Sequence, residues 1–190
     1  MSPKELIRDQ ARKHRALACI DPNASAQIRD HFFSALPLGP AHRLAGYWPK
    51  GQECDPVPIL ERALAQGTPC ALPVVQKDTK LLKFRPWDSK TPMTAGPYGL
   101  LEPAPENTAD TGILPDIVLV PLLAFDRQGG RLGQGGGYYD ATLAALRAQK
   151  EILAVGIAYA DQAVLFPLPA EPHDQKLDWV ITPQGAQCFV

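Results

Sequence analysis

Six of the nine residues at positions 129–137 are glycine, and this run constrains the fold more than any other part of the sequence. Ordering a glycine costs more backbone entropy than ordering any other residue, so a dense run is typical of a backbone that something must approach closely. The apolar segment 117–125 before it predicts a buried parallel strand, and the apolar periodicity after it predicts a helix over 139–149. This order, strand then glycine loop then helix, presents a helix N-terminus to an anion.

The residue types around the run favour a phosphate as that anion. Successive backbone N–H groups bind phosphate oxygens, Arg131 adds a cation with a planar donor fork, and Asp140 offers the hard oxygen that Mg²⁺ prefers. Two familiar phosphate motifs do not match, because Tyr138 stands where a P-loop needs lysine and a dinucleotide fingerprint needs glycine. Two plainer interpretations stay open: a flexible glycine linker, and Asp140 as an acid that the helix dipole favours.

Strands alternate with helices along the rest of the chain, which predicts the α/β class with a mostly parallel sheet flanked by helices. Helices are expected at 3–18, 24–35 and 58–65, and strands at 43–47, 70–75, 81–86, 116–121, 153–158 and 179–182. In the first helix, Leu6, Ala11 and Leu17 are expected on one side. The aperiodic segment 86–115 is interpreted as a substrate-side loop with Tyr98 and Glu102 as weak candidates, and 183–190 as a short tail.

Composition narrows the class of protein further. A length of 190 residues predicts one domain over 1–190, and a net charge of −1 argues against a nucleic-acid partner. No segment approaches the ~20 apolar residues of a membrane span, and the N-terminus lacks a signal-peptide core, so we expect a cytoplasmic monomer that acts on a small molecule. The cysteines lie far apart without C-x-x-C spacing, which argues against a zinc site or a disulfide framework.

Several short motifs occur in one order along nearly the whole chain. They are Lys-x-x-x-Arg (4–8), Leu-Pro-Val-Val (72–75), Tyr-Gly-Leu-Leu-Glu-Pro (98–103), Pro-Leu-Leu-Ala-Phe-Asp (121–126), Arg-Leu-Gly (131–133), Gly-Gly-Gly-Tyr-Tyr-Asp (135–140) and His-Asp-Gln-Lys-Leu-Asp (173–178). Together they closely resemble the signature of the 5-formyltetrahydrofolate cyclo-ligase family, also called methenyltetrahydrofolate synthetase. The resemblance implies a single-domain, three-layer, Rossmann-like fold similar to that of sugar-phosphate isomerases and CoA transferases.

The resemblance also implies a reaction and its cofactors. With ATP and Mg²⁺, 5-formyltetrahydrofolate closes to 5,10-methenyltetrahydrofolate through a phosphorylated formyl (imino-phosphate) intermediate, and ADP and phosphate are released. The residues implied as catalytic are Arg131 and Tyr139. Those implied for substrate binding are Trp48, Glu53 and Tyr139, and those for the metal are Asp140 and Asp174. Those implied for the nucleotide are Lys4, Arg8, Arg131, Leu132, Gly133, Gln134, Gly135, Gly136, Gly137, Tyr138 and Tyr139.

Departures and alternatives accompany these assignments. Family members often carry an aromatic or basic residue where Gln134 stands and a basic residue where Ala141 stands, which bears on substrate contacts. Asp174 could instead pair with Lys176, and His173 is interpreted as a surface residue rather than a general base.

Other positions and other functions also stay open. Trp48 could belong to the core, Glu53 could be a solvated loop acid, and the basic face of the first helix could simply be solvated. The alternative functions are a sugar-phosphate isomerase-like enzyme and a non-catalytic module that binds nucleotide or folate.

Overall fold

A seven-stranded sheet forms the centre of the protein, in a computed structural model that describes residues 2–17, 21–105 and 112–189. In spatial order its strands are β11 (Gly185–Cys188), β10 (Trp179–Thr182), β9 (Leu153–Ile157), β6 (Ile117–Pro121), β1 (Leu44–Ala45), β2 (Cys70–Val75) and β3 (Leu82–Trp87). The five inner strands are parallel, and the two edge strands β3 and β11 are antiparallel to their neighbours. The predicted α/β class with a mostly parallel sheet is confirmed.

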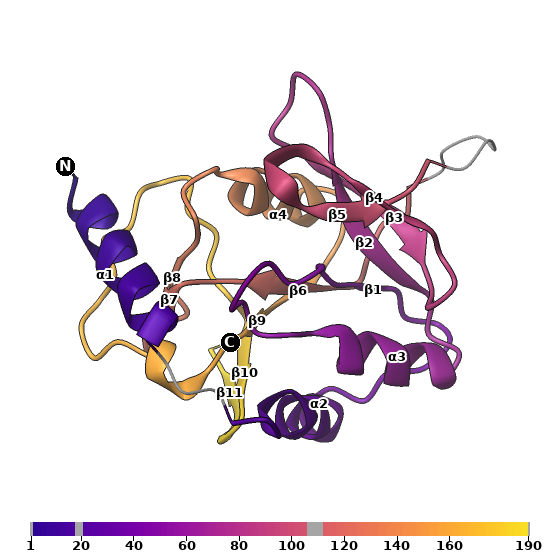
Figure 1. The fold of residues 1–190 in the computed structure, drawn as a ribbon, viewed down its shortest axis with the longest axis horizontal. Coiled ribbons are helices and arrows are strands. Elements are labelled where there is room, and N and C mark those ends of the chain that lie inside the picture. The colour runs from indigo at the N-terminus through magenta and orange to yellow at the C-terminus, as the bar shows by residue number, and fades with distance from the viewer. Residues whose placement is uncertain (1, 18–20, 106–111, 190) are drawn as a thin grey trace.

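Helices cover both faces of this sheet (Figure 1). On one face lie α2 (Ala24–Ala35) and α3 (Val57–Ala65), and on the other lies α4 (Tyr138–Arg147). The central strand β6 serves both apolar layers, because Leu119 packs in the cluster that contains α2 and α3 while Val118 and Val120 pack in the cluster that contains α4. The layers are therefore helix, sheet and helix, as expected.

The first helix, α1 (Pro3–Leu17), stands apart from these layers (Figure 1). Its Ile7 packs against a small cluster formed by Ala124, Leu132 and Leu168, and Lys4 is its one buried residue among those described. The expected apolar side of this helix is wrong, since Leu6 is 50% exposed and Leu17 is 86% exposed. The reason is that α1 docks through charged side chains, which hydrophobic periodicity does not reveal.

Two further expectations about strands are wrong. The apolar run 117–125 is not one strand: β6 ends at Pro121, and β7 (Ala124–Phe125) turns back to pair with β8 (Arg131–Leu132) in an antiparallel ribbon. The carbonyl groups of Leu122 and Leu123, between the strands, accept hydrogen bonds from the Gln162 side chain. The segment 183–190 is not a tail, because 185–188 forms β11 beside β10.

The segment 86–115 also contains structure that its sequence did not predict. Strands β4 (Met93–Ala95) and β5 (Leu101–Pro103) form a hairpin with a short 3₁₀ segment, Pro97–Gly99, at its tip. Of the four cysteines, Cys54 and Cys70 are buried free thiols, Cys188 is exposed on β11, and Cys19 lies outside the described residues. No helix in the described ranges is long and apolar enough to span a membrane.

The connections leave the centre of the sheet in opposite directions. The chain passes from β1 through α3 to β2, and from β6 through α4 to β9, so the order reverses between the neighbours β1 and β6. In open α/β sheets a ligand binds in the crevice at the carboxyl ends of the strands beside such a reversal. The topology therefore predicts where a binding site lies.

Candidate active site

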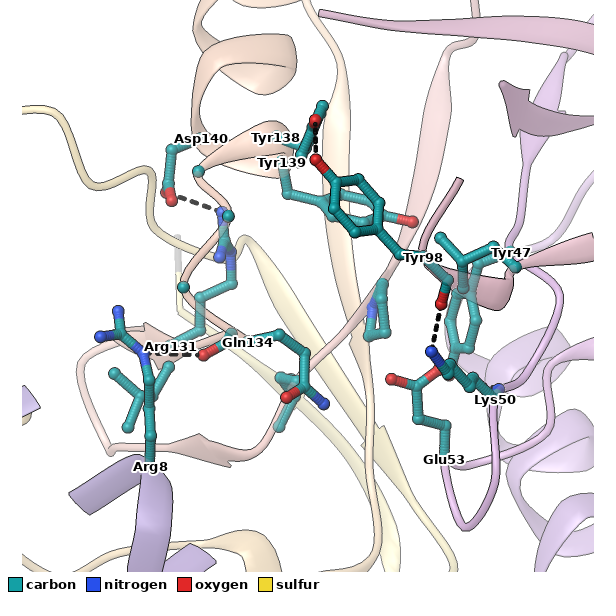
Figure 2. Close-up of a pocket in the computed structure, with 18 of the residues that line it drawn as sticks. Arg8, Tyr47, Lys50, Glu53, Tyr98, Arg131, Gln134, Tyr138, Tyr139 and Asp140 are labelled. Atoms are coloured by element: carbon teal, nitrogen blue, oxygen red, sulfur yellow. Dashed lines mark hydrogen bonds and ion pairs between the residues drawn. The ribbon is translucent and has the colours of Figure 1, made fainter. Parts of the chain in front are cut away.

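A cavity of about 1100 Å³ opens at this reversal. Its floor includes Tyr47 and Trp48 after β1, Val75 at the end of β2, and Pro121 and Leu122 at the end of β6. The glycine loop and α1 form one side, and the β4–β5 hairpin and the loop after β1 form the other (Figure 2). Every candidate site residue predicted from the sequence borders this one cavity.

The glycine run divides into a structural half and a cavity half. Gly129 and Gly130 belong to the turn between β7 and β8, where the buried Asp126 carboxylate accepts the Gly130 N–H at 2.8 Å. A Cβ at Gly130 would lie 2.5 Å from that carboxylate, so this glycine serves the fold. The cavity half is the loop 133–137, which leads directly into α4.

The glycines of loop 133–137 leave room for cations and for an open helix end. Gly135 has a φ of +103°, and a Cβ there would lie 3.4 Å from Cζ of Arg8. Gly137 has a left-handed φ of +74°, serves as N-cap of α4, and provides no side-chain cap for the first amides of that helix. A Cβ at Gly137 would lie 3.5 Å from Nζ of Lys80, a cavity cation that the sequence analysis missed. Uncapped helix N–H groups beside cations suit an anion.

Helix α1 docks on this loop through arginines. Arg8 donates from Nε to the Gly133 carbonyl at 3.1 Å (Figure 2). Arg12, one turn further along, donates from Nε to Oε1 of Gln134 at 3.2 Å and from Nη2 to its backbone carbonyl at 3.1 Å. Lys4 and Arg8 share one face of α1 and both border the cavity, as their spacing predicted.

Lys4 is held by two carboxylates. Its Nζ lies 2.6 Å from Oδ2 of Asp174 and 3.2 Å from Oε2 of Glu171. Burial lowers the pKa of Lys4, but the hydrogen bonds and charges of these carboxylates outweigh it and raise the pKa above its ordinary value. Burial raises the pKa of Asp174, but the hydrogen bonds from Lys4 and from the Glu171 backbone, together with the nearby positive charges, outweigh burial and lower this pKa. Asp174 therefore pairs with Lys4, and the alternative pairing with Lys176 does not occur.

Arg131 and Asp140 form a second ion pair, deeper in the wall. Nη2 of Arg131 lies 2.7 Å from Oδ1 of Asp140, which also accepts the backbone N–H of Gln175 at 2.9 Å. The Arg131 side chain is 4% exposed, and its Nε is buried without a hydrogen-bond partner in the described structure. Burial lowers the pKa of Arg131 and the charge of Asp140 opposes this shift. A buried, unpaired charged donor is costly, so an acceptor that entered the cavity and reached it would be stabilised.

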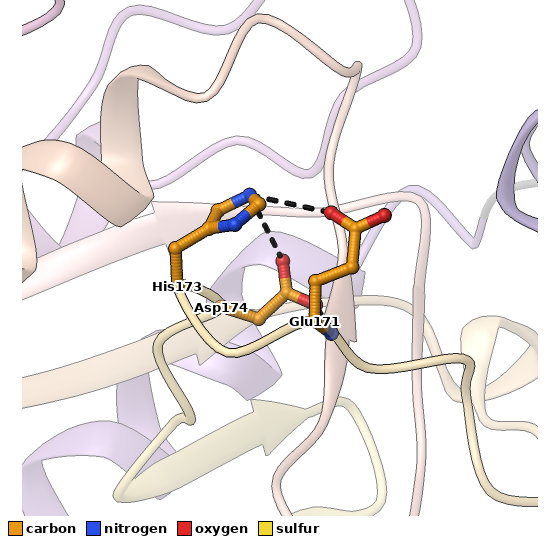
Figure 3. Close-up of side chains that lie close together, drawn as sticks. All are labelled: Glu171, His173 and Asp174. Atoms are coloured by element: carbon orange, nitrogen blue, oxygen red, sulfur yellow. Dashed lines mark hydrogen bonds and ion pairs between the residues drawn. The ribbon is translucent and has the colours of Figure 1, made fainter.

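The two predicted metal ligands both border the cavity but do not form one carboxylate cluster. Asp174 groups with Glu171 and His173, whose ligand atoms lie within 4.8 Å of one another in the described part of the chain (Figure 3). Asp140 is outside that group and is engaged by Arg131. His173 is exposed, with Nε2 3.3 Å from Oε2 of Glu171, which agrees with its interpretation as a surface residue.

The opposite side of the cavity is aromatic and acidic. The half-buried Trp48 packs on the core, edge-on to Trp87 at 6.2 Å, in agreement with its core interpretation. Trp48 also borders the cavity, and its role in substrate binding stays a prediction. Glu53 accepts the Lys50 backbone N–H at 3.1 Å. Burial raises the pKa of Tyr139, and the charge of Glu53 adds to that shift, so this phenol stays protonated at neutral pH.

The β4–β5 hairpin reaches across to the glycine loop. At its tip Tyr98 has a φ of +60°, uncommon for a residue other than glycine, and its hydroxyl lies 3.0 Å from that of Tyr138. The Lys50 ammonium donates to the Tyr98 carbonyl (Figure 2). Glu102 also borders the cavity, but it is buried and accepts the Val75 N–H at 2.9 Å, which indicates a structural role.

Comparison with known proteins agrees with this geometry. The sequence profile of the 5-formyltetrahydrofolate cyclo-ligase family matches residues 1–183. The chain belongs to this family. A 5-formyltetrahydrofolate cyclo-ligase from Haemophilus influenzae is 33% identical over 179 residues, which cover 92% of this chain and 94% of the relative. Another, from Mycolicibacterium smegmatis, is 37% identical over 145 residues, which cover 74% of this chain and 73% of the relative.

Solved structures extend the likeness to the whole cyclo-ligase fold. The 5,10-methenyltetrahydrofolate synthetase of Aquifex aeolicus is 25% identical and superimposes with a TM-score of 0.77, covering 99% of this chain and 93% of that one. The corresponding protein of Mycoplasma pneumoniae, 22% identical, shares the fold with a TM-score of 0.73, covering 96% and 99%. The family predicted from the motif order is confirmed, and with it the assignment of the chain as an ATP-dependent folate cyclo-ligase.

Proposed function

We propose that this protein binds ATP and Mg²⁺ beside 5-formyltetrahydrofolate in the cavity described above and closes the folate ring there, with release of ADP and phosphate. The observation that carries the proposal is the division of one cavity into two chemically different sides. One side has the glycine loop, the open N-terminus of α4 and several cations, which suit a triphosphate. The other side has Trp48, Glu53 and Tyr139, which suit a flat heterocycle with N–H donors.

The reaction needs an activated formyl oxygen. This oxygen attacks the γ-phosphorus of ATP, the bond to the β-phosphate oxygen breaks, and ADP leaves. The folate N10 then attacks the carbon of the imino-phosphate, its proton is lost, and phosphate departs with the former formyl oxygen. Because the nucleophiles belong to the substrates, the protein contributes positioning and charge neutralisation, as in other phosphoryl transfers.

Named residues fit these tasks. The Arg131 fork, held from one side by Asp140 and with Nε unpaired, would neutralise the phosphoryl group in transfer. Lys4 and Arg8 would hold the nucleotide from α1, with the backbone of loop 133–137 around the phosphates. Tyr139, protonated at neutral pH, would donate a hydrogen bond to the substrate from the side of the cavity that it shares with Glu53.

The carboxylates beside these cations fit a hard divalent ion. Asp140 and Asp174 would hold Mg²⁺, directly or through water, because each places carboxylate oxygens at the phosphate side of the cavity. When bound, the ion would neutralise charge on the phosphates. The ion pair with Lys4 lowers the pKa of Asp174, and the ion pair with Arg131 orients the Asp140 carboxylate.

We also propose that residues 1–190 act as one domain and as a monomer. The support is that α1, the hairpin, the glycine loop and the segment around 171–174 all border one cavity within one chain.

An absorbance assay for methenyltetrahydrofolate tests the proposal. Purified protein is mixed with 5-formyltetrahydrofolate and Mg²⁺, with and without ATP, and ADP release is measured in parallel. We expect an ATP-dependent rise in absorbance with one ADP per product. Arg131→Lys keeps the charge but loses the fork, so its kcat should fall about 10²-fold. Lys13→Leu, at an exposed position of α1 that does not border the cavity, is the control.

The other possible results of this assay identify the alternatives. Product without ATP dependence would contradict the proposal. Nucleotide binding without ADP release would favour the non-catalytic module.

A further inference from the structure

Arg12 donates two hydrogen bonds to one residue of the glycine loop. Its Nε and Nη2, adjacent donors of one planar fork, reach the side-chain oxygen and the backbone carbonyl of Gln134. Gln134 is the single residue of loop 133–137 that has a side chain, since the other four are glycines. It is therefore the one residue of this loop that can be held both by its backbone and by its side chain.

The contacts from α1 fix the direction of two peptide groups. Arg8 draws the Gly133 carbonyl towards α1, and Arg12 draws the Gln134 carbonyl the same way. These peptides are trans, so the N–H of each points opposite to its carbonyl. The N–H groups of Gln134 and Gly135 consequently point away from α1, and the arginines determine the direction in which the loop offers its donors.

Such a restraint matters in a segment of this composition. Glycines on both sides of Gln134 have wide backbone freedom, and Gln134, Gly135 and Gly136 are all exposed. A loop that must be ordered when its ligand binds loses affinity by the cost of that ordering. A clamp that orders the loop beforehand reduces that cost.

We propose that Arg12 is a positioning residue for the nucleotide site, and that it acts through Gln134 rather than by contact with ATP. The inference rests on the proposed function, because the ligand whose binding it improves is the nucleotide. Nε and Nη2 of Arg12 are both used on Gln134, whereas Arg8 uses only Nε on the loop among the hydrogen bonds described. Arg8 keeps its outer nitrogens for the ligand, and Arg12 holds the loop.

A double-mutant cycle separates an indirect role from a direct one. The variants are Arg12→Leu, Gln134→Leu and the pair together, with Lys13→Leu as the matched charge-loss control on α1. We measure the Kd for ADP with Mg²⁺ by calorimetry, and the KM for ATP and kcat by the absorbance assay. Arg12→Leu should raise the Kd and the KM for ATP about three- to tenfold, since each lost hydrogen bond has a modest net effect. Gln134→Leu should have a smaller effect, because the backbone contact survives.

The double variant decides the proposal. If Arg12 acts through Gln134, the pair should be no worse than Arg12→Leu alone, with kcat and the KM for the folate near wild-type values. Effects that multiply would overturn the proposal, because Arg12 would then act independently of Gln134. Unchanged binding in Arg12→Leu would overturn it as well.

Hydrogen exchange of the ligand-free protein keeps this test independent of the catalytic assignment. Arg12→Leu should speed amide exchange in loop 133–137 and in α1, and Lys13→Leu should not. A wild-type protein that bound no nucleotide would contradict the proposed function, while the exchange comparison would still report on the clamp. Equal exchange in wild type and Arg12→Leu would show that no clamp exists.

Discussion

Helices α1 and α2 lie near each other in the sequence but are attached to the protein in different ways. Helix α2 inserts Ile28 and Phe32, both fully buried, into the apolar layer beneath the sheet. Helix α1 places Lys4 between two carboxylates, and its Arg8 and Arg12 donate hydrogen bonds to backbone carbonyls of a glycine loop. Apolar burial stabilises a fold under almost any ionic condition, whereas polar contacts of this kind respond to pH, salt and ligands. The contrast separates a helix that builds the domain from a helix that builds the site.

The largest expected effect is a loss of stability caused by a substitution in α2. Phe32→Ala removes a fully buried ring and should lower the free energy of unfolding by about 3–5 kcal/mol, as measured by urea denaturation. Because the domain loses stability as a whole, amide exchange should rise in α2, α4 and the sheet together. A rise confined to α2 would show that this helix is not part of the common core.

The corresponding test for α1 is Asp174→Asn, which removes the charged partner of Lys4 in that helix. Lys4 keeps Glu171, so we expect a loss of about 1–3 kcal/mol in unfolding free energy at pH 7, with exchange rising first in α1.

The pH dependence of this loss has a definite sign. The lowered pKa of Asp174 means that its contribution is complete above the unfolded pKa, about 4, and is lost as pH falls through the folded value. The raised pKa of Lys4 means that its contribution is complete below about pH 10 and is lost on raising pH through the folded value. The gap between wild type and Asp174→Asn should stay constant from pH 5 to 9 and close under stronger acid. A gap that widened on acidification would contradict the pairing.

A smaller effect, on the KM for ATP, should follow from Gly135→Ala in the loop to which α1 is hydrogen-bonded. The left-handed φ of +103° disfavours alanine, and the new Cβ would meet the Arg8 guanidinium at 3.4 Å. We expect the KM for ATP to rise about tenfold, a change that corresponds to roughly 1.4 kcal/mol in binding free energy. Thermal stability should change little. Gly39→Ala is the matched control, since nothing lies within 4 Å of a Cβ there. Equal KM values in the two variants would separate Gly135 from nucleotide binding.

The smallest expected effect is that of salt on the wild-type protein. Raising ionic strength from about 0.05 to 0.5 M shortens the Debye length severalfold, so exchange in α1 should rise modestly while α2 stays unchanged. Hydrogen exchange with mass spectrometry reports both helices in one experiment. Equal responses of α1 and α2 would remove the distinction between them.

The sequence predicted those parts of the protein that follow from periodicity and from motif order. The inner strands, α2, α3 and α4 appeared at nearly the expected positions because apolar side chains alternate between the layers of the sheet. The site residues were predicted as a group because their motifs occur in one order. Their convergence on one cavity depends on the reversal between β1 and β6, which only the topology shows.

Features that depend on pairing between distant segments were missed. Strand β11 is short and exposed, and its residues are extended because they pair with β10. The contacts of Lys4 with Asp174 and Glu171 join residues about 170 positions apart, so no local pattern encodes them. The exposed Leu6 and Leu17 misled the periodicity argument because α1 is fixed by charges.

The contact between Lys4 and Asp174, which lie 170 positions apart, has a consequence for biosynthesis. Strands β1, β2, β6 and β9 pair with one another, and all of them are translated before the segment around 171–174. The cavity acquires its last wall when the segment around 171–174 leaves the ribosome and meets α1. A nascent chain that ends after β9 therefore lacks the partner of Lys4, and the proposed site can be complete only after the segment that holds Asp174 has been made.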